Sequence, residues 1–479
     1  MKITSPLGVA ALLAVLVPAL TAQNAPASSA SSALPSDTEI RRMLAERVQS
    51  LAGSEDGIGI VIGIIEPKGR RVIAFGHSSQ KDQRPLNGET VFEIGSVSKV
   101  FTALLLSDMA RTGEVALTDP VLKYLPAGKK VPAHDGHPIT LVDLATHTSG
   151  LPFMTDAIPA LTEAPVTEHS NAEIYRFLAG YKLSRDPGAE WDYSNVGYWL
   201  LGEALSSRAG MSYEELLKTR ISGPLELHST AAILTPALKA RMAVGHNAEL
   251  HPAPLFSSIS IYNQMTAAGG LVSTVNDLLK FLAVAMGYES SPLGSSMAEM
   301  LNTRRPMGKS DQALGWVVLG KGDDQLYMHD GSTWGYSSYV VWDPKRRVGI
   351  VALSNQLASV GDIALHLLRP DTPLEPPVVA RHIEIKIDSH NLDAFAGEYD
   401  VEDEGVAQVV REGNFLTLTL PISWGLPKFR LRPESRTAFF VAELPVRVTF
   451  QTDAKGQING LLLYPPRGQH PLPAKKIAR

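Results

Sequence analysis

The chain has 479 residues, of which 44% are hydrophobic and 19% charged, and its formal net charge is −5 at pH 7. The length predicts two or three domains, the composition is that of a soluble globular protein, and the weak acidity argues against a nucleic-acid partner. The sequence contains no cysteine, which excludes thiol nucleophiles, disulfides and cysteine-ligated zinc, so any covalent chemistry must use a hydroxyl, an amine or a carboxylate.

The first 27 residues are typical of a secretory signal peptide. One positive residue precedes an apolar stretch over 7–20, and small residues offer cleavage sites at Ala22 or Ala27. The apolar stretch is short and a proline interrupts it, which favours a signal peptide over a membrane span, with an uncleaved anchor as the alternative. We therefore expect a periplasmic or secreted protein with no stable membrane span after cleavage, in which residues 28–36 form a disordered linker.

The next segments predict an α+β domain over residues 37–368. After residue 36, the pattern EIRRMLAERVQSLA predicts an amphipathic helix, and DGIGIVIGIIEPKGRRVIAFG predicts a β-hairpin. From Ser96 to about residue 300 the apolar spacing is mainly helical. Strands are expected again at 315–320, 325–330 and 337–355, the last as a hairpin around DPKRR. Strands at both ends of the domain indicate an antiparallel sheet that is flanked by helices and carries an inserted, mostly helical subdomain.

The last part of the chain is expected to form a separate small domain. Four prolines between residues 369 and 380 predict a stiff linker, which we place at 369–388. Residues 389–479 alternate apolar and polar positions between turn residues, the pattern of a small antiparallel barrel or sandwich.

A Ser-x-x-Lys motif, Ser96 and Lys99, marks the start of the helical region. Residues three apart share one face of a helix, so the amine can reach the hydroxyl, and the positive end of a helix dipole favours an alkoxide. A second copy, Ser78 and Lys81, lies in the polar stretch HSSQKDQRPLNGE, which predicts a solvated loop. The alternative for Ser96 is a helix N-cap, and for Lys99 a surface amine.

Tyr193 and Asn195 form the one Tyr-x-Asn among thirteen tyrosines. A phenol becomes a usable base only beside a cation, which Lys99 can supply, and the amide of Asn195 can hold the lysine or contact a substrate amide. A tyrosine that packs on Trp191 beside a turn-forming asparagine is the alternative.

The third motif, His329-Asp330-Gly331 followed by Ser332, is predicted at the end of a strand. There Gly331 would allow a substrate backbone to approach closely, and the N–H of Ser332 would point toward it. The same tripeptide at 134–136 lies in a loop without strand alternation, which predicts an exposed turn.

These three motifs, in this order, resemble those of the penicillin-recognising serine hydrolases, specifically the class C β-lactamase-like group with its D,D-carboxypeptidases, D-aminopeptidases and esterases. The flanking segments EVALTDPVLKYLP, ITLVDLATHTSGLP and AAGGLVSTVNDLLKFL are similar to the same family. The resemblance covers about residues 40–358. The tail from about residue 390, with AFAGEYDV, resembles the lipocalin-like barrel of several family members.

The resemblance implies a role for each motif residue and needs neither a metal nor a cofactor. The implied roles are Ser96 as nucleophile, Lys99 and Tyr193 as the proton-transfer pair, Asn195 as a substrate amide contact, His329 with Gly331 as the strand groove, and the backbone N–H groups of Ser96 and Ser332 as the oxyanion hole. The expected partner is a small-molecule or peptide substrate, with cell-wall peptide as one candidate, and the oligomeric state is left open.

The predicted function is an exported serine acyl hydrolase that forms an acyl-enzyme at Ser96 on a D-amino-acid peptide or a β-lactam. A carboxylesterase of the same fold and a penicillin-binding sensor that acylates without turnover are the alternatives. His329 stands where dedicated class C β-lactamases have lysine, and Asp330 where threonine or serine is usual, which weakens the expectation of efficient β-lactam hydrolysis. An imidazole with an ordinary pKa near ~6.5 would make carboxylate recognition weak and dependent on pH.

Overall fold

The computed structural model describes residues 34–52, 57–154, 171–247, 250–255, 265–375, 382–401, 405–421, 428–442, 446–453, 455–464 and 471–477. The predicted signal peptide lies outside the described residues, as does most of the linker expected at 28–36.

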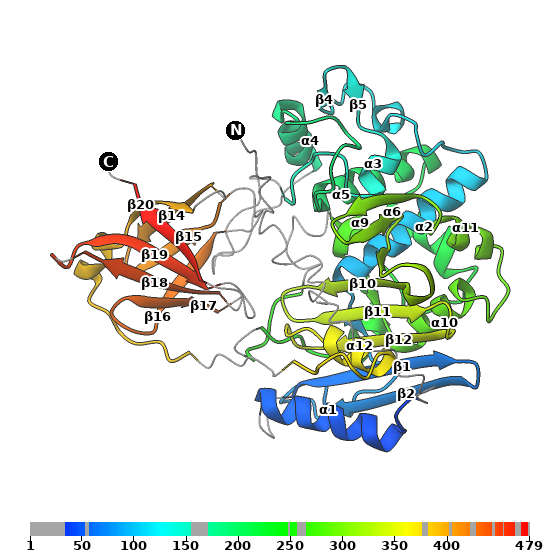
Figure 1. Ribbon diagram of the computed structural model, residues 1–479, viewed down its shortest axis with the longest axis horizontal. Helices are drawn as coiled ribbons and strands as arrows, with labels where there is room; N and C mark the ends of the chain where they lie inside the picture. Colours follow the sequence, from blue (N-terminus) through cyan, green and yellow to red (C-terminus); the bar gives the residue numbers. More distant parts are fainter. Residues whose placement is uncertain are drawn as a thin grey trace.

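An eight-stranded antiparallel sheet forms the centre of the first domain (Figure 1). Its order is β2-β1-β12-β11-β10-β9-β8-β7. The strands are β1 (Gly59–Glu66), β2 (Gly69–Gly76), β7 (Arg304–Met307), β8 (Ser310–Ala313), β9 (Val317–Leu319), β10 (Leu326–Ser332), β11 (Ser337–Asp343) and β12 (Val348–Ser354). The pairing of β1 with β12, for example Ile60 with Ser354, closes the sheet with segments from opposite ends of the domain, as the sequence predicted.

Both faces of the sheet are buried, because its strands alternate apolar side chains between two cores. Ile60, Ile62 and Ile64 of β1 join the core beneath α1 (Asp37–Ala52) and α12 (Gly361–Leu368), whereas Val61 and Ile65 join the core of the helical side. The predicted helix and hairpin near the N-terminus are therefore confirmed. The β7–β8 hairpin and α12 were not predicted.

The helical subdomain lies against one face of the sheet (Figure 1). Its helices are α2 (Ser98–Arg111), α3 (Leu141–Ala145), α4 (Asn171–Gly180), α5 (Asn195–Ala209), α6 (Tyr213–Leu217), α7 (Pro236–Arg241), α9 (Thr266–Gly269), α10 (Val275–Ala285) and α11 (Gly294–Glu299). Two short ladders accompany them, β3 (Phe92–Glu93) with β6 (Val272–Ser273), and β4 (Ala133–His134) with β5 (His137–Pro138). Helix α2 is buried along nearly its whole length, so it is the central helix of this layer.

The C-terminal domain is a closed eight-stranded antiparallel barrel, which confirms the predicted barrel (Figure 1). Its strands are β13 (Gly397–Val401), β14 (Gly405–Glu412), β15 (Phe415–Thr419), β16 (Phe429–Pro433), β17 (Ala438–Val441), β18 (Val446–Thr452), β19 (Ile458–Tyr464) and β20 (Leu472–Lys476). Pairing of β13 with β20 closes the barrel. Rings of Phe395, Tyr399, Phe439 and Phe450 contact one another in its core. The likeness to lipocalins stays a prediction.

The proline-rich segment between the domains is held at both ends. At its start, the backbone of Glu375 bonds to Asp362 and Arg47, which also pair with each other. At its end, Ile385 donates its N–H to the carbonyl of Pro433 in the barrel. Within the described ranges, no helix is both long enough and apolar enough to span a bilayer.

Candidate active site

Ser96 is the accessible residue in an otherwise buried stretch. It lies in a 3-10 turn over Gly95–Val97, and α2 begins two residues later, at Ser98. The residues from Val91 to Val100 are buried except for Ser96, which is partly exposed. The N-cap of α2 is Val97 and makes no side-chain capping bond, so the N-cap alternative for Ser96 is wrong. Its hydroxyl is free to face the site.

Lys99 is fully buried, and three oxygen atoms surround its amine. Its Nζ lies 3.0 Å from Ser96 Oγ, 2.7 Å from Asn195 Oδ1 and 2.5 Å from the carbonyl oxygen of Ala268. Burial lowers the pKa of Lys99 well below its ordinary value, against a smaller opposing effect of Asp330. A neutral amine has two N–H donors and one lone pair, which match the two carbonyl acceptors and the serine hydroxyl. The surface-amine alternative is therefore wrong.

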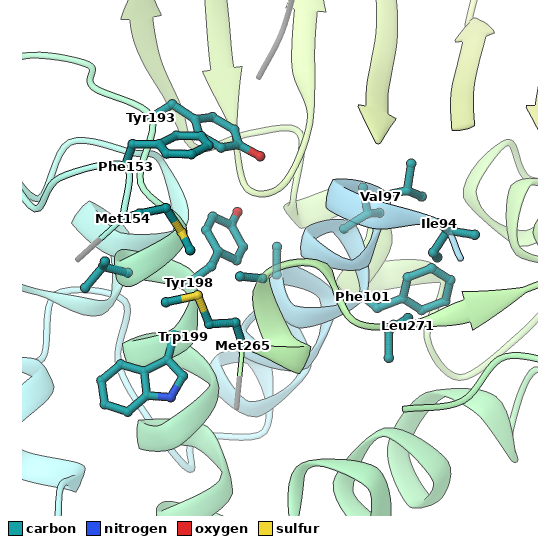
Figure 2. Close-up of a cluster of buried hydrophobic side chains, with 14 of the residues drawn as sticks. Ile94, Val97, Phe101, Phe153, Met154, Tyr193, Tyr198, Trp199, Met265 and Leu271 are labelled. Atoms are coloured by element: carbon teal, nitrogen blue, oxygen red, sulfur yellow. The ribbon is translucent and has the colours of Figure 1, made fainter. Parts of the chain in front are cut away.

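Tyr193 approaches the same hydroxyl from a different segment. Its phenol donates to Ser96 Oγ at 2.7 Å, and Lys99 Nζ lies 4.8 Å from its ring centroid. The ring of Phe153 stacks on that of Tyr193 with centroids 5.9 Å apart (Figure 2). Burial raises the pKa of Tyr193 well above its ordinary value, with the Ser96 hydrogen bond acting in the opposite direction. The predicted proximity to Lys99 is present, but the resting tyrosine is a neutral phenol rather than a phenolate.

Two glycines bring the turn at Ser96 against the end of β10. A Cβ on Gly331 would lie 2.1 Å from the carbonyl oxygen of Ile94 and 2.9 Å from the nitrogen of Ser96, and a Cβ on Gly95 would lie 2.5 Å from the nitrogen of Ser332. Glycine is thus required at both positions for the two segments to approach. The Cβ position of Gly331 therefore faces the chain's own backbone, and the close approach of a substrate backbone to this glycine stays a prediction.

His329 shares the face of β10 with Gly331, two residues away. The ladder with β9 covers Leu326–Met328, and His329 follows it directly. Its ring is 1% exposed, and Nδ1 lies 2.7 Å from the carbonyl oxygen of Asp330. A carbonyl only accepts, so Nδ1 carries the proton and Nε2 is an acceptor. Burial, with a further contribution from Lys99, lowers the pKa of His329 to about 3. The expectation that this ring titrates near neutral pH is wrong.

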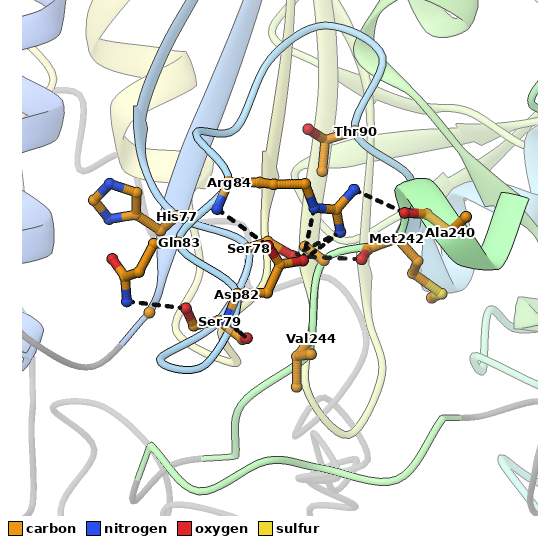
Figure 3. Close-up of polar contacts among 12 residues, drawn as sticks. His77, Ser78, Ser79, Asp82, Gln83, Arg84, Thr90, Ala240, Met242 and Val244 are labelled. Atoms are coloured by element: carbon orange, nitrogen blue, oxygen red, sulfur yellow. Dashed lines mark hydrogen bonds and ion pairs between the residues drawn. The ribbon is translucent and has the colours of Figure 1, made fainter.

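The second Ser-x-x-Lys copy does not form a comparable site (Figure 3). Ser78 is 3% exposed and lies within 3.5 Å of both the carbonyl of Met242 and the guanidinium of Arg84. Its burial contradicts the expected solvated loop. Lys81 is exposed, so this serine lacks a buried amine three residues on.

The second His-Asp-Gly copy lies in the turn of the β4–β5 hairpin, as predicted. The Nδ1 atoms of His134 and His137 lie 2.7 and 3.1 Å from one carboxylate oxygen of Asp186. Over the described part of the chain, no group of three or more histidine, aspartate or glutamate side chains is arranged to hold a metal ion.

Two contributors to the site were missed in the sequence. The carbonyl of Ala268 completes the surroundings of Lys99, and it lies in AAGGLV, one of the segments that resemble the family. His147, in HTSGLP, stacks on Tyr193 with ring centroids 4.2 Å apart. Both residues lie in segments that resemble the family. Those segments could have indicated a role for Ala268 and His147, but they were used only to recognise the family.

Comparison with known proteins identifies the family. Residues 41–369 match the family model described as Beta-lactamase. The chain belongs to the β-lactamase family. Residues 381–475 match a domain of unknown function, DUF3471. The protein is a serine hydrolase of the β-lactamase and penicillin-binding type.

The relatives include a carboxypeptidase, a penicillin-binding protein and a β-lactamase. The chain is 28% identical to the D-alanyl-D-alanine-carboxypeptidase/endopeptidase AmpH of Escherichia coli strain K12, over 61% of this chain and 77% of that protein. It is also 28% identical to penicillin-binding protein 4* of Bacillus subtilis strain 168, over 82% of this chain and 89% of that protein. A solved class C β-lactamase, 21% identical, superposes with a TM-score of 0.61 over 71% of this chain and 97% of its own, and supports the fold.

Proposed function

We propose that the protein is an exported serine acyl hydrolase that forms an acyl-enzyme at Ser96 on an amide or ester bond. The observation that carries the proposal is the convergence of two groups on one partly exposed hydroxyl. Lys99 Nζ and Tyr193 Oη lie 3.0 and 2.7 Å from Ser96 Oγ, although they come from segments almost 100 residues apart. A nucleophile within hydrogen-bond reach of two proton-transfer groups is the arrangement that covalent catalysis needs.

The lowered pKa of Lys99 suits it to accept a proton, and the raised pKa of Tyr193 suits it to donate one. Neutral Lys99 accepts the proton of Ser96 as Oγ attacks the carbonyl carbon of the substrate, and the oxyanion forms near the N–H groups of Ser96 and Ser332. As the intermediate collapses, Tyr193 donates its proton to the leaving nitrogen or oxygen and regains one from the Lys99 ammonium. Water then attacks the acyl-enzyme, gives up a proton through the same pair, and Ser96 leaves as the hydroxyl.

The substrate we favour is a D-amino-acid peptide or a β-lactam, with a carboxylesterase of this fold and a sensor that acylates without turnover as alternatives. The name of the Escherichia coli relative supports a D-alanyl peptide. Asn195, whose Oδ1 accepts a hydrogen bond from Lys99, would also contact a substrate amide. A neutral His329 offers no positive charge to a substrate carboxylate, and this observation supports the carboxylesterase alternative. The signal-like N-terminus supports export.

Covalent labelling tests the nucleophile. Ser96→Ala should abolish labelling by a fluorophosphonate or a fluorescent penicillin, while Ser78→Ala, the matched control, should leave it unchanged. Labelling that persists in the Ser96 variant would contradict the proposal. Sustained turnover of a D-Ala-D-Ala peptide, a p-nitrophenyl ester or a cephalosporin identifies the enzyme and its substrate class, whereas a single stoichiometric burst on all three identifies a sensor.

A further inference from the structure

His147 occupies an unusual position directly after α3. Its backbone φ is +56°, a left-handed conformation that residues other than glycine rarely adopt. Its side chain is 1% exposed, and within the described residues its Nε2 has no hydrogen-bond partner. Backbone strain and an unsatisfied buried polar atom both cost stability, and they persist where the surrounding structure or the function requires them.

Three contacts from His147 hold the segment that carries Tyr193. The imidazole stacks on the Tyr193 ring, with centroids 4.2 Å apart and planes 26° apart. On either side, the N–H of Ser194 donates to His147 Nδ1 at 3.0 Å, and the N–H of Asp192 donates to the His147 carbonyl at 2.7 Å. One residue therefore fixes three consecutive residues, with the tyrosine in the middle.

The protonation state of His147 suits this contact. Because Nδ1 accepts from a backbone N–H, the neutral ring must carry its proton on Nε2. Burial, followed by the charge of Lys99 and the nearby His329, lowers the pKa of His147 well below its ordinary value. Nδ1 therefore stays available as an acceptor at neutral pH, and the imidazole that stacks on the Tyr193 ring carries no charge.

We infer that His147 is a positioning residue for the acylation step, which holds the Tyr193 hydroxyl on Ser96 through its ring, its Nδ1 and its carbonyl oxygen. The inference rests on the proposed function, because it acts through Tyr193. His147 contacts Tyr193 directly, so we expect its effect on the reaction to pass through the tyrosine rather than through its electrostatic interaction with Lys99. The 2.7 Å bond from Tyr193 to Ser96 is the contact that depends on it.

The test is a double-mutant cycle with a fluorophosphonate probe, measured on the full chain. His147→Ala removes the ring and the acceptor, and it should lower the maximal labelling rate, kinact, by about 10²-fold, the scale of a 1 Å misplacement, with little change in KI. His147→Asn keeps an acceptor near the Nδ1 position and tolerates positive φ, so it should recover part of that loss. In the Tyr193→Phe background, both substitutions should change kinact by less than about twofold.

Controls separate positioning from folding. Labelling is normalised to the number of sites that react at completion, and His366→Asn, at a partly exposed position of α12 on the opposite face of the sheet, should leave kinact unchanged. If His147→Ala does not fold, His147→Asn and His147→Phe, which keep the acceptor and the ring respectively, carry the same cycle. Losses that add fully to that of Tyr193→Phe, or unchanged kinact in the His147 variants, would overturn the inference. Unchanged kinact in Tyr193→Phe alone would instead overturn the proposed role of Tyr193, and the inference with it.

Discussion

Replacing His329 with lysine tests how the site discriminates substrates by charge. In the structure the ring is neutral, because its burial, with a further contribution from Lys99, lowers the pKa to about 3 against the opposing effect of the hydrogen bond to the carbonyl of Asp330. The wild-type protein therefore has no cation at this position at any pH from about 5.5 to 8.5. A lysine has a longer side chain and an ammonium, which we expect to reach a carboxylate of the substrate.

The expected gain is modest, and it is best measured as a ratio. A partly exposed ion pair contributes on the order of 1 kcal/mol, or about fivefold in kcat/KM. A permanent cation at position 329 would also affect Lys99, which is near enough to lower the pKa of His329. That disturbance affects acylation of every substrate by Ser96. It cancels when kcat/KM for a carboxylate-bearing cephalosporin is divided by kcat/KM for an uncharged p-nitrophenyl ester.

The assay compares this ratio in the wild-type protein, His329→Lys and the neutral control His329→Gln. We expect the ratio to rise about fivefold in the lysine variant, to stay within twofold in the glutamine variant, and to be independent of pH between about 5.5 and 8.5 in the wild type. An unchanged ratio in His329→Lys would refute the placement of this position beside the substrate. A wild-type ratio that rises as the pH falls through about 6.5 would refute the neutral histidine.

Three further predictions follow from the same geometry. Lys99→Ala should slow acylation by about 10²–10⁴-fold, and Lys99→Arg by a similar factor, since arginine stays protonated and cannot accept a proton. Burst kinetics measure both, and near-normal acylation in Lys99→Arg would exclude the lysine as base. His329 in the unfolded chain binds a proton below about pH 6.5, and the folded ring does not. The free energy of unfolding should therefore decrease by about 2 kcal/mol as the pH is lowered from 6.5 to 5. Urea denaturation should show His329→Gln without this component, and an equal pH dependence in both proteins would contradict the buried neutral ring. Deletion of residues 381–479 should leave a folded domain that still acylates. Circular dichroism measures its folding, and a truncated chain that is unfolded while the full chain is folded would contradict the prediction.

The sequence was sufficient where a local pattern and a chemical requirement coincide. Ser96 and Lys99 were separated from Ser78 and Lys81 by the apolar spacing that follows the first pair, and the structure places Lys99 in the core and Lys81 in solvent. The closing of the sheet by β1 and β12 was likewise predictable, because strongly apolar strands at both ends of a domain have to bury their faces together.

The sequence was insufficient where tertiary contacts decide the outcome. The β7–β8 hairpin has partly exposed, polar strands, so its residues show no clear alternation. The charge of His329 depends on burial by distant segments, which no local pattern reports. The need for glycine at position 331 arises from Ile94 and Ser96, more than 200 residues earlier. Each of these features is fixed by segments that meet only in the folded chain.

The resting charges of the site explain why burial of a lysine can serve catalysis here. An ammonium at the depth of Lys99 would have to be desolvated, and the lowered pKa avoids this by favouring the neutral amine. Tyr193 is also neutral, so Ser96 lies between two uncharged groups before substrate binds. In the proposed mechanism, charge separates only when Ser96 attacks, which creates an ammonium on Lys99 and an oxyanion on the substrate in the same low-dielectric surroundings. Their attraction therefore stabilises the transition state and not the ground state, which is the condition for a higher rate of acylation rather than tighter substrate binding.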